Sequence, residues 1–317
     1  MFSFIKMLES IHSYIMSKKW LFFTMLTITS ATGILVSMTA INFMTRDVAK
    51  QTYMEEHRLD KKLLEGFLVA KYDSLLSVAG LISIHPTMIS HLNDKSDEKL
   101  NNFLQSAATT INDRTNSVPI NIKYYAKDHK IVNSENIELS NLVMDSKQNV
   151  SGIVINKDGV RLIGITPIEH NKKVIGAIEV SQSVHAVKDD FERLGKEFVF
   201  ILNKSQLVFL DVSHKTDVYH DIDDNYKVAF HEYDSKFYVN LQKLDIEELI
   251  NEKYVNTKNF YTTNDPAIDL NGREIGLFVI GESANNANSF VQITKNMITS
   301  VTTVALGLVI SLILFMF

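Results

Sequence analysis

The sequence predicts an α+β protein: a long N-terminal helix leads into two successive modules with antiparallel sheets, and two transmembrane helices flank the whole. Three observations predict this architecture. Two uncharged apolar runs lie near the ends of the 317-residue chain. A helical repeat of apolar residues follows the first run. Strand patterns separated by tight turns then occur twice before the second run.

The two apolar runs cover residues 20–44 and residues 297–317. A helix of about 20 residues crosses the roughly 30 Å hydrocarbon core of a bilayer, so both runs are long enough to span it. A cleaved signal has an apolar run of only about 7–15 residues. The first run is longer and begins only at residue 20, so we expect a retained anchor and place both helices in the lipid bilayer.

Basic residues indicate the orientation of the first span. Lys18 and Lys19 precede it, whereas Arg46 and Lys50 follow it together with Asp47. An excess of positive charge marks the cytoplasmic side. We therefore expect residues 1–19 to be cytoplasmic and residues 45–296 to form an extracytoplasmic loop.

Composition excludes two classes of protein. The chain has no cysteine, so it is not a small fold held together by disulfides. Its net charge is −5 with acidic and basic residues interspersed, and no basic patch alternates with aromatic residues. Nucleic acid is therefore not an expected partner.

The loop begins with a helical region, residues 45–116. Leucine and aromatic residues recur at three- and four-residue spacing over residues 46–83, which predicts a helix continuous with the first span. His85-Pro86 ends it, because a residue before proline avoids the α region. A second helix is expected over residues 87–113.

The first module is expected over residues 117–195, with strand patterns, one helix at residues 135–145 and a closing helix at residues 184–194. Its turns at Lys157-Asp158-Gly159 and His170-Asn171-Lys172 are typical of hairpins. The expected strands cover residues 120–126, 131–132, 152–156, 160–168 and 174–180.

The second module is expected over residues 196–283, with one helix at residues 246–251. An exit helix, residues 284–296, should continue into the second span, so that residues 284–317 form one helical segment. The expected strands cover residues 198–202, 207–212, 228–233, 237–241, 260–263 and 275–280.

An internal comparison supports two modules. Residues 168–176 align with residues 268–276, so that Gly176 matches Gly276, and Ser183 matches Ser283 at the same offset. Each copy is a turn that feeds the last strand of a sheet. Such self-similarity indicates a repeated structural unit.

Several segments carry a resemblance to a known family: residues 153–162, 164–168, 173–180 and, in the second copy, 271–276. With the helical and membrane pattern, the chain resembles the double Cache sensor domain of bacterial transmembrane receptors of the methyl-accepting chemotaxis type. The resemblance implies two PAS-like modules in the periplasm, an inner-membrane location and a homodimer. It also implies that a small ligand binds the first, membrane-distal module while the second, membrane-proximal module couples to the second span.

The chain departs from that family in two ways. The family's amino-acid-binding pattern needs a tryptophan in the sensor loop, but the only tryptophan is Trp20 at the membrane edge. No kinase motif or signalling hairpin follows the second span, so we expect the cytoplasmic output to be absent from this chain.

Candidate ligand-binding residues lie on two strands of the first module. Asn121, Lys123 and Tyr125 share one strand face, while Arg161 and Ile163 share a face of a strand expected to neighbour it. Arginine can bind a carboxylate through two hydrogen bonds, and tyrosine offers a ring and a hydroxyl. Thr166 near the strand end completes the set. Alternatively, the cations occupy a solvated face and the tyrosine belongs to the core.

Motifs for catalysis or cofactors are missing from the sequence. It has no phosphate-binding loop, dinucleotide fingerprint or nucleophile turn. The acidic stretch at residues 221–225 loosely imitates a calcium loop, but Tyr226 stands where glycine is needed. We therefore expect no enzyme activity, no cofactor and no metal.

These observations favour the sensory and membrane-spanning part of a bacterial chemotaxis receptor that relays ligand binding through the second span. The input domain of a sensor histidine kinase or a diguanylate cyclase is an alternative, because such proteins differ in the output. A membrane-anchored extracytoplasmic scaffold without a small ligand is another.

Overall fold

The computed structural model describes residues 2–94, 96–115, 118–127, 136–211, 219–229, 235–287 and 289–315. The chain forms two compact units. One comprises Met54–Ala287, and the other comprises Met1–Tyr53 with Asn288–Phe317. Both sheets belong to the first of these units.

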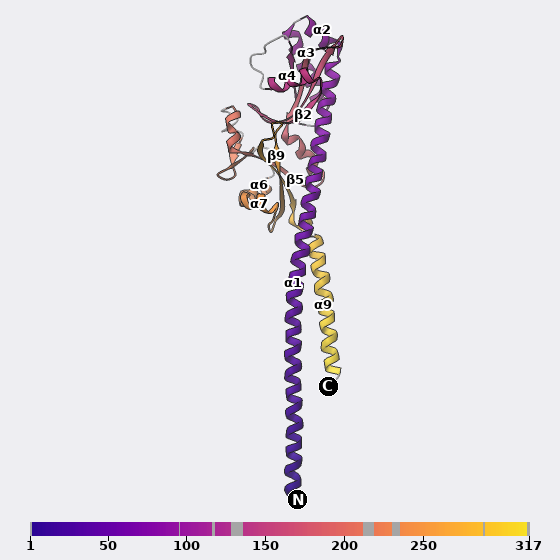
Figure 1. Ribbon diagram of the computed structural model, residues 1–317, viewed down its shortest axis with the longest axis vertical. Coiled ribbons are helices and arrows are strands. Elements are labelled where there is room, and N and C mark those ends of the chain that lie inside the picture. Colours follow the sequence, from indigo (N-terminus) through magenta and orange to yellow (C-terminus); the bar gives the residue numbers. More distant parts are fainter. Residues whose placement is uncertain are drawn as a thin grey trace. The chain divides into compact units, whose positions relative to one another are not determined.

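Helix α1 runs without a break from Phe2 to Ser83 (Figure 1). The expected helix over residues 46–83 is thus confirmed. The side chain of His85 accepts a hydrogen bond from the amide of Thr87 and caps the next helix, α2 (Pro86–Asn93). The single helix expected over residues 87–113 was wrong. The amide of Asp94 donates to the carbonyl of Ser90, which closes α2, and α3 (Asp97–Arg114) begins after Ser96.

One described helical segment, Leu35–Ser83 of α1, contains a stretch long and apolar enough to cross a membrane. Helix α9 (Ser289–Phe315) follows the short helix α8 (Ala284–Ala287). Its 27 residues give it the length that a bilayer requires. The second transmembrane span stays a prediction.

The first sheet has four antiparallel strands in the order β1-β4-β3-β2. Helix α4 (Ile137–Ser146) connects β1 to β2, and a 3₁₀ turn η1 (Val184–Val187) with α5 (Lys188–Glu192) follows β4. The strand expected at residues 131–132 lies outside the described residues. The strands are β1 (Ile120–Ala126), β2 (Val150–Asn156), β3 (Gly159–His170) and β4 (Lys173–Ser183).

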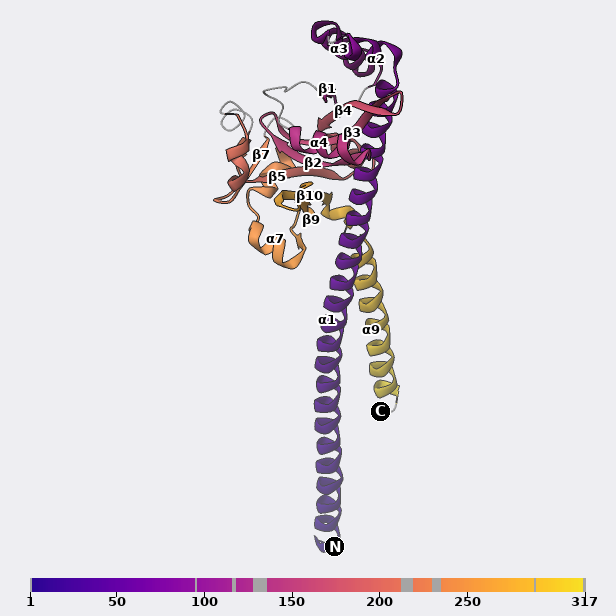
Figure 2. The same ribbon diagram turned by 45° about the horizontal axis from the view of Figure 1, so that its top comes forward.

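Both faces of this sheet are covered (Figure 2). On one face, Leu162 and Ile178 join the core that includes Leu75 of α1. Gly164 permits the close approach of α1, since a Cβ there would lie 2.9 Å from the backbone nitrogen of Leu76. The opposite face packs against α4 in a separate cluster of buried side chains: Tyr125, Val143, Met144, Val154, Ile163, Ile165, Val174 and Ala177.

The second sheet has six antiparallel strands in the order β6-β7-β5-β10-β9-β8. Helices α6 (Ser235–Leu241) and α7 (Ile246–Glu252) pack on one face through a core of their own. The strands are β5 (Glu197–Asn203), β6 (Tyr219–Asp221), β7 (Tyr226–Ala229), β8 (Tyr254–Asn256), β9 (Phe260–Ile268) and β10 (Glu274–Ser283).

Two strand predictions in this region were wrong. Residues 204–209 form a 3₁₀ helix, η2 (Lys204–Phe209), whose first turn is capped by Asn203 accepting from the amide of Ser205. The expected strand at residues 237–241 is helix α6. Phe237 and Leu241 are fully buried at helical spacing, so packing against the sheet overrides the strand preference of this apolar run.

The two halves of the internal repeat occupy equivalent hairpins. Strands β1-β4-β3-β2 and β5-β10-β9-β8 have the same order and orientation. Gly176 and Gly276 each face a carbonyl of the neighbouring strand, where an added Cβ would lie 2.6 Å from the oxygen of Tyr125 and 2.1 Å from that of Ile201. The sequence similarity therefore reflects a shared backbone constraint.

A buried charged cluster joins α1 to the six-stranded sheet. The ammonium of Lys196, directly before β5, lies 2.6 Å from Glu56, 2.7 Å from Asp60 and 2.9 Å from Glu282. Asp60 is 1% exposed. The cluster fixes α1 against the last residues of β10, the strand that precedes α8 and α9 in the chain.

Candidate ligand-binding site

The sequence-predicted site residues lie in the four-stranded sheet, but strand order places them differently than expected. Strand β4 lies between β1 and β3, so these two strands are not neighbours. Lys123 pairs with Glu179 of β4, and Asn121 pairs with Ser181. On the other side of β4, Ile163 pairs with the same Ser181.

Five of the six predicted residues share the face that α4 covers. Paired residues of antiparallel strands project to the same face. Through β4, this rule places Asn121, Lys123 and Tyr125 on the face of Arg161 and Ile163; of these, Asn121 is exposed, Arg161 and Lys123 are half-buried, and Tyr125 and Ile163 are buried.

Thr166 belongs to the opposite face. It pairs with Ile178, which packs toward α1. Its hydroxyl is buried and has no hydrogen-bond partner among the described residues. Thr166 is therefore separated from the other five residues by the thickness of the sheet.

Glu179 is the polar centre of this face, and sequence reasoning missed it as a site residue. It is 1% exposed, in the middle of β4. The hydroxyl of Tyr125 donates to its Oε2 at 2.7 Å, and the side-chain amide of Asn136 donates to the same atom at 2.9 Å. Its other oxygen, Oε1, is buried and has no hydrogen-bond partner among the residues that the structure describes.

A buried carboxylate oxygen without a donor is energetically costly. Glu179 thus presents an acceptor that a ligand ammonium or hydroxyl would satisfy. A signal for it existed in the sequence: Glu179 is the one charged residue in the apolar run of residues 174–180. Strand order was needed to place it between the two predicted strands.

Arg161 lies on the same face as Glu179. It pairs with Ser183 of β4, which is two same-face positions beyond Glu179. Its Nε donates to the hydroxyl of Ser181 at 3.1 Å, and a terminal nitrogen donates to the Ser181 carbonyl at 3.5 Å. Ser181 lies between Arg161 and Glu179 on this face. Lys123 approaches Asp158 at 3.9 Å, near the turn between β2 and β3.

A cavity of about 850 Å³ adjoins this face at the edge strand β2. Asn136, the hydrogen-bond donor to Glu179, lines this cavity. Leu139 and Leu142 of α4 and Val154 of β2 line it as well. The turn between β9 and β10 supplies part of its wall through Asp269 and Arg273.

This wall is rigid. Two nitrogens of Arg273 donate to Oδ2 of Asp269 at 2.9 Å and 2.6 Å. Burial alone would raise the pKa of Asp269, but hydrogen bonds from Arg273 and Asn271 hold it below its ordinary value. The amide of Leu270 also donates to the carbonyl of Ile153, which fixes the turn to β2.

In the acidic stretch at residues 221–225, Asp223 is satisfied by backbone amides and Asp221 by lysines. Asp223 accepts from the amides of Asn225 and Tyr226, both at 2.7 Å. Asp221 pairs with Lys204 at 2.8 Å and with Lys227 at 3.4 Å. These contacts account for the carboxylates of Asp221 and Asp223.

No family model matches this chain, and no curated protein matches it. Three solved structures illustrate the structural matches. The sensor domain of the Vibrio cholerae histidine kinase DctB has 10% sequence identity and a TM-score of 0.38, with 73% of this chain and 98% of that chain covered.

The other two are chemoreceptor domains. The sensory domain of the Campylobacter jejuni chemoreceptor Tlp3 has 9% identity and a TM-score of 0.38, covering 76% of this chain and 98% of that chain. The ligand-binding domain of the Pseudomonas fluorescens chemoreceptor CtaA in complex with L-isoleucine has 9% identity and a TM-score of 0.38, covering 77% and 98%. Each is a sensory domain to which this chain is similar in structure.

Proposed function

We propose that this chain is the ligand-sensing and membrane-anchored part of a bacterial receptor of the chemotaxis type, located in the inner membrane as a homodimer. The observation that carries the proposal is the buried Glu179, whose Oε1 lacks a donor among the described residues on the face that also holds Arg161. Residues 45–296 would lie in the periplasm, with the membrane-distal module at residues 117–195 and the membrane-proximal module at residues 196–283.

The charges on this face favour a small ligand that carries an ammonium group, and a zwitterion would use both Glu179 and Arg161. An ammonium would satisfy Oε1 of Glu179, while a carboxylate on the same molecule would pair with the guanidinium of Arg161. The side chains of Tyr125 and Ser181 lie beside these two groups. An α-amino acid carries both of these charged groups, and this arrangement would bind it without a tryptophan in the loop.

Ligand binding changes a receptor only by favouring one of its arrangements. An occupant between Glu179 and α4 would stabilise one position of α4 and of the edge strand β2. Strand β2 is bonded to the β9–β10 turn through Ile153 and Leu270. Strand β10 leads through α8 to α9, so the change has a covalent route to the second span.

The test is isothermal titration of the full chain in lipid nanodiscs with L-α-amino acids, each paired with its α-hydroxy acid and its amine. An amino acid should bind, and either analogue should bind at least roughly tenfold more weakly, the loss of about one charged contact. Glu179→Gln should abolish the preference over the hydroxy acid, and Arg161→Met the preference over the amine.

Matched controls keep this test specific. Glu169→Gln on β3 and Lys173→Met on β4 alter exposed charges of the same sheet and should leave the affinity unchanged. Unchanged affinity in both Glu179→Gln and Arg161→Met would remove the proposed site. Binding of no small molecule would instead favour a scaffold that recognises a protein.

A further inference from the structure

Carboxylates outnumber cations in the buried cluster around Lys196. The ammonium of Lys196 bonds three carboxylates: Glu56 and Asp60 on α1, and Glu282 at the end of β10. The side chain of Asp60 is 1% exposed, whereas those of Glu282 and Glu56 are 17% and 31% exposed. When all of these groups are ionised, three negative charges share one positive charge, and two of the three lie on α1.

Asp60 is the most deeply buried carboxyl of this cluster. Burial raises its pKa to about 6, an effect that the attraction of Lys196 only partly offsets, and the charges of Glu56 and Glu282 raise it further. Its Oδ2 is buried and has no hydrogen-bond partner among the described residues. When carboxylates share one site, the pKa of one of them is strongly raised. Below about pH 6, a neutral Asp60 leaves Lys196 to the other two carboxylates.

Two groups that face Asp60 from the sheet, Lys196 and Tyr261, keep a fixed charge near neutral pH. Burial alone would lower the pKa of Lys196, but its carboxylate partners raise it, so it stays a cation. Tyr261 pairs with Glu282 across β9 and β10 and therefore shares the face that α1 covers. Burial raises the pKa of Tyr261, and the negative charges of Asp60 and Glu56 raise it further, so the phenol stays neutral.

His57 is another titratable group at the contact between α1 and the sheet. Its Nδ1 contacts the hydroxyl of Thr263 on β9, and its pKa is lowered, chiefly by burial. The charged groups that act on it are Asp265, Lys61 and Lys253, and Lys61 pairs with Asp265 at 2.8 Å. His57 therefore faces β9 rather than the cluster, and mutation can separate its contribution from that of the cluster.

Loss of the Asp60 proton should weaken the hold of α1 on the end of β10. The ionised Asp60 competes for Lys196 and, together with Glu56, repels Glu282. Asp60 and Glu56 both lie on α1, so Glu282 is the carboxylate whose displacement separates two elements. Its side chain is partly exposed, so its carboxylate can leave the cluster and be solvated.

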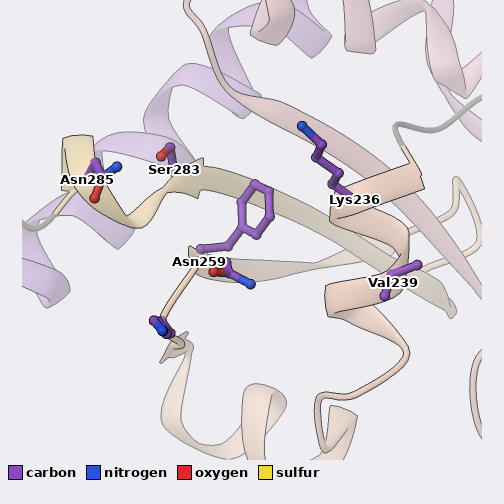
Figure 3. Close-up of a pocket in the computed structure, with 7 residues that line it drawn as sticks. Lys236, Val239, Asn259, Ser283 and Asn285 are labelled. Carbon is purple, nitrogen blue, oxygen red and sulfur yellow. The ribbon is translucent and has the colours of Figure 1, made fainter.

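The segment that follows Glu282 borders a hollow. Figure 3 shows Ser283 and Asn285 where β10 passes into α8, with Asn259 of the turn before β9 close by. The hollow, of about 730 Å³, lies between this segment and α6, so the segment has room on that side. The amide of Ala284 donates to the carbonyl of Asn259 at 2.8 Å. A movement at the end of β10 would therefore carry into α8 and, along the chain, to α9.

We propose that the cluster of Lys196, Glu56, Asp60 and Glu282 is a pH-sensitive switch, in which a proton on Asp60 keeps the end of β10 against α1 and loss of that proton releases it. This goes beyond the ligand binding proposed for the four-stranded sheet and needs no ligand. Helix α1 contains the first apolar run and α8 precedes α9, so the switch joins segments that lead to both expected spans. With residues 45–296 in the periplasm, it would respond to the pH outside the cytoplasm.

The test measures the distance between the two elements in the full chain in nanodiscs. The chain has no cysteine, so Leu59→Cys on α1 and Asn286→Cys on α8, both at exposed positions, can carry two spin labels for double electron–electron resonance. Dilution with unlabelled chain restricts the signal to distances within one chain. The ratio of molecules at a longer distance to those at a shorter one should rise about tenfold between about pH 5 and pH 7.5, because release returns Asp60 to its ordinary, lower pKa.

Three variants of the cluster assign the change. Asp60→Asn, a neutral isostere, should show the shorter distance at both pH values. Glu282→Gln should show the longer distance at both, because its pair with Lys196 is lost. Glu56→Gln should retain the change but at a lower pH, since the charge of Glu56 raises the pKa of Asp60.

Two control variants and the contrary outcomes complete the test. Asp73→Asn removes an exposed carboxyl of α1 and, like His57→Gln, should leave the change as in the wild type. Equal distances in the wild type at both pH values, or a change that persists in Asp60→Asn, would overturn the proposal. A change that is lost in His57→Gln but kept in Asp60→Asn would assign it to the histidine instead. If Asp60→Asn does not fold, Glu56→Gln decides, because an unshifted change in that variant overturns the proposal.

Discussion

The ammonium of Lys196 lies 2.7 Å from Oδ1 of Asp60, and it also pairs with Glu56 and Glu282. One cation thus serves three carboxylates from two different parts of the fold, α1 and the end of β10. Oδ2 of Asp60 is buried and has no hydrogen-bond partner among the described residues. Ionised carboxylates in excess of cations are costly in a buried site.

Lys196→Met should strongly destabilise the unit that contains both sheets. Removing one partner of a buried ion pair costs about 3–5 kcal/mol, because the other charges remain without compensation. In a domain of this size each kcal/mol lowers the midpoint of thermal unfolding by about 2–4 °C. Circular dichroism melts at neutral pH measure the loss, with the exposed Lys243→Met as the control. A midpoint equal to that of the control would show that the cluster contributes little.

Asp60 should make stability depend on pH. Its pKa is raised from 3.8 to about 6, chiefly by burial, which the attraction of Lys196 only partly offsets; Glu56 and Glu282 raise it further. The folded protein therefore retains this proton more tightly than the unfolded chain. The resulting stabilisation is complete below the unfolded pKa and is lost as the pH rises through about 6.

Asp60→Asn should remove this dependence. In the wild-type chain, Asp60 should lower the free energy of unfolding by on the order of 2–3 kcal/mol between about pH 4 and pH 7. Denaturant unfolding of both proteins across this range gives the difference directly. Parallel pH profiles for the two proteins would contradict the assignment.

The two repeat glycines should be equally intolerant of a side chain. In Gly176→Ala and Gly276→Ala the new methyl group meets a carbonyl of the adjacent strand, and overpacking of this kind costs about 1–3 kcal/mol. Gly66→Ala is the matched control, since nothing lies within 4 Å of its added Cβ, and in a helix it should stabilise by about 0.5–1 kcal/mol. If either strand variant melts like the control, the two hairpins are not equivalent.

Thr166→Val should stabilise the fold or leave it unchanged, and should not alter ligand affinity. The hydroxyl is buried without a partner among the described residues, so an apolar group of similar shape removes a desolvation cost of about 1–3 kcal/mol. Because Thr166 faces α1 rather than α4, a change in ligand affinity would contradict the placement of the site.

Local patterns predicted the long helix, the faces of individual strands and the repeated hairpin. Alternation alone placed Lys123 and Tyr125 on one face of β1, and the structure shows that they share the face of Arg161. The rest depended on which strands are neighbours. Glu179 became visible as the centre of the face only once β4 was known to lie between β1 and β3.

Tertiary packing, rather than local preference, also determined whether one segment forms a helix or a strand. Phe237, Tyr238 and Val239 favour a strand, yet they form α6. Gly281, more than forty residues later, opens the space that receives the Phe237 ring. A contact so distant in sequence cannot be inferred from the segment itself.

We expect the α4 face of the four-stranded sheet to bind a small ammonium-bearing molecule. The most direct measurement is thermal unfolding of the full chain in nanodiscs against amino acids, amines, organic acids, sugars and purines, in the wild type and in Glu179→Gln. A ligand at about 100 times its dissociation constant should stabilise the wild type by about 2.7 kcal/mol, and Glu179→Gln should lose that stabilisation. If no ammonium compound stabilises the wild type, or if both proteins are stabilised equally, the α4 face does not bind such a molecule through Glu179.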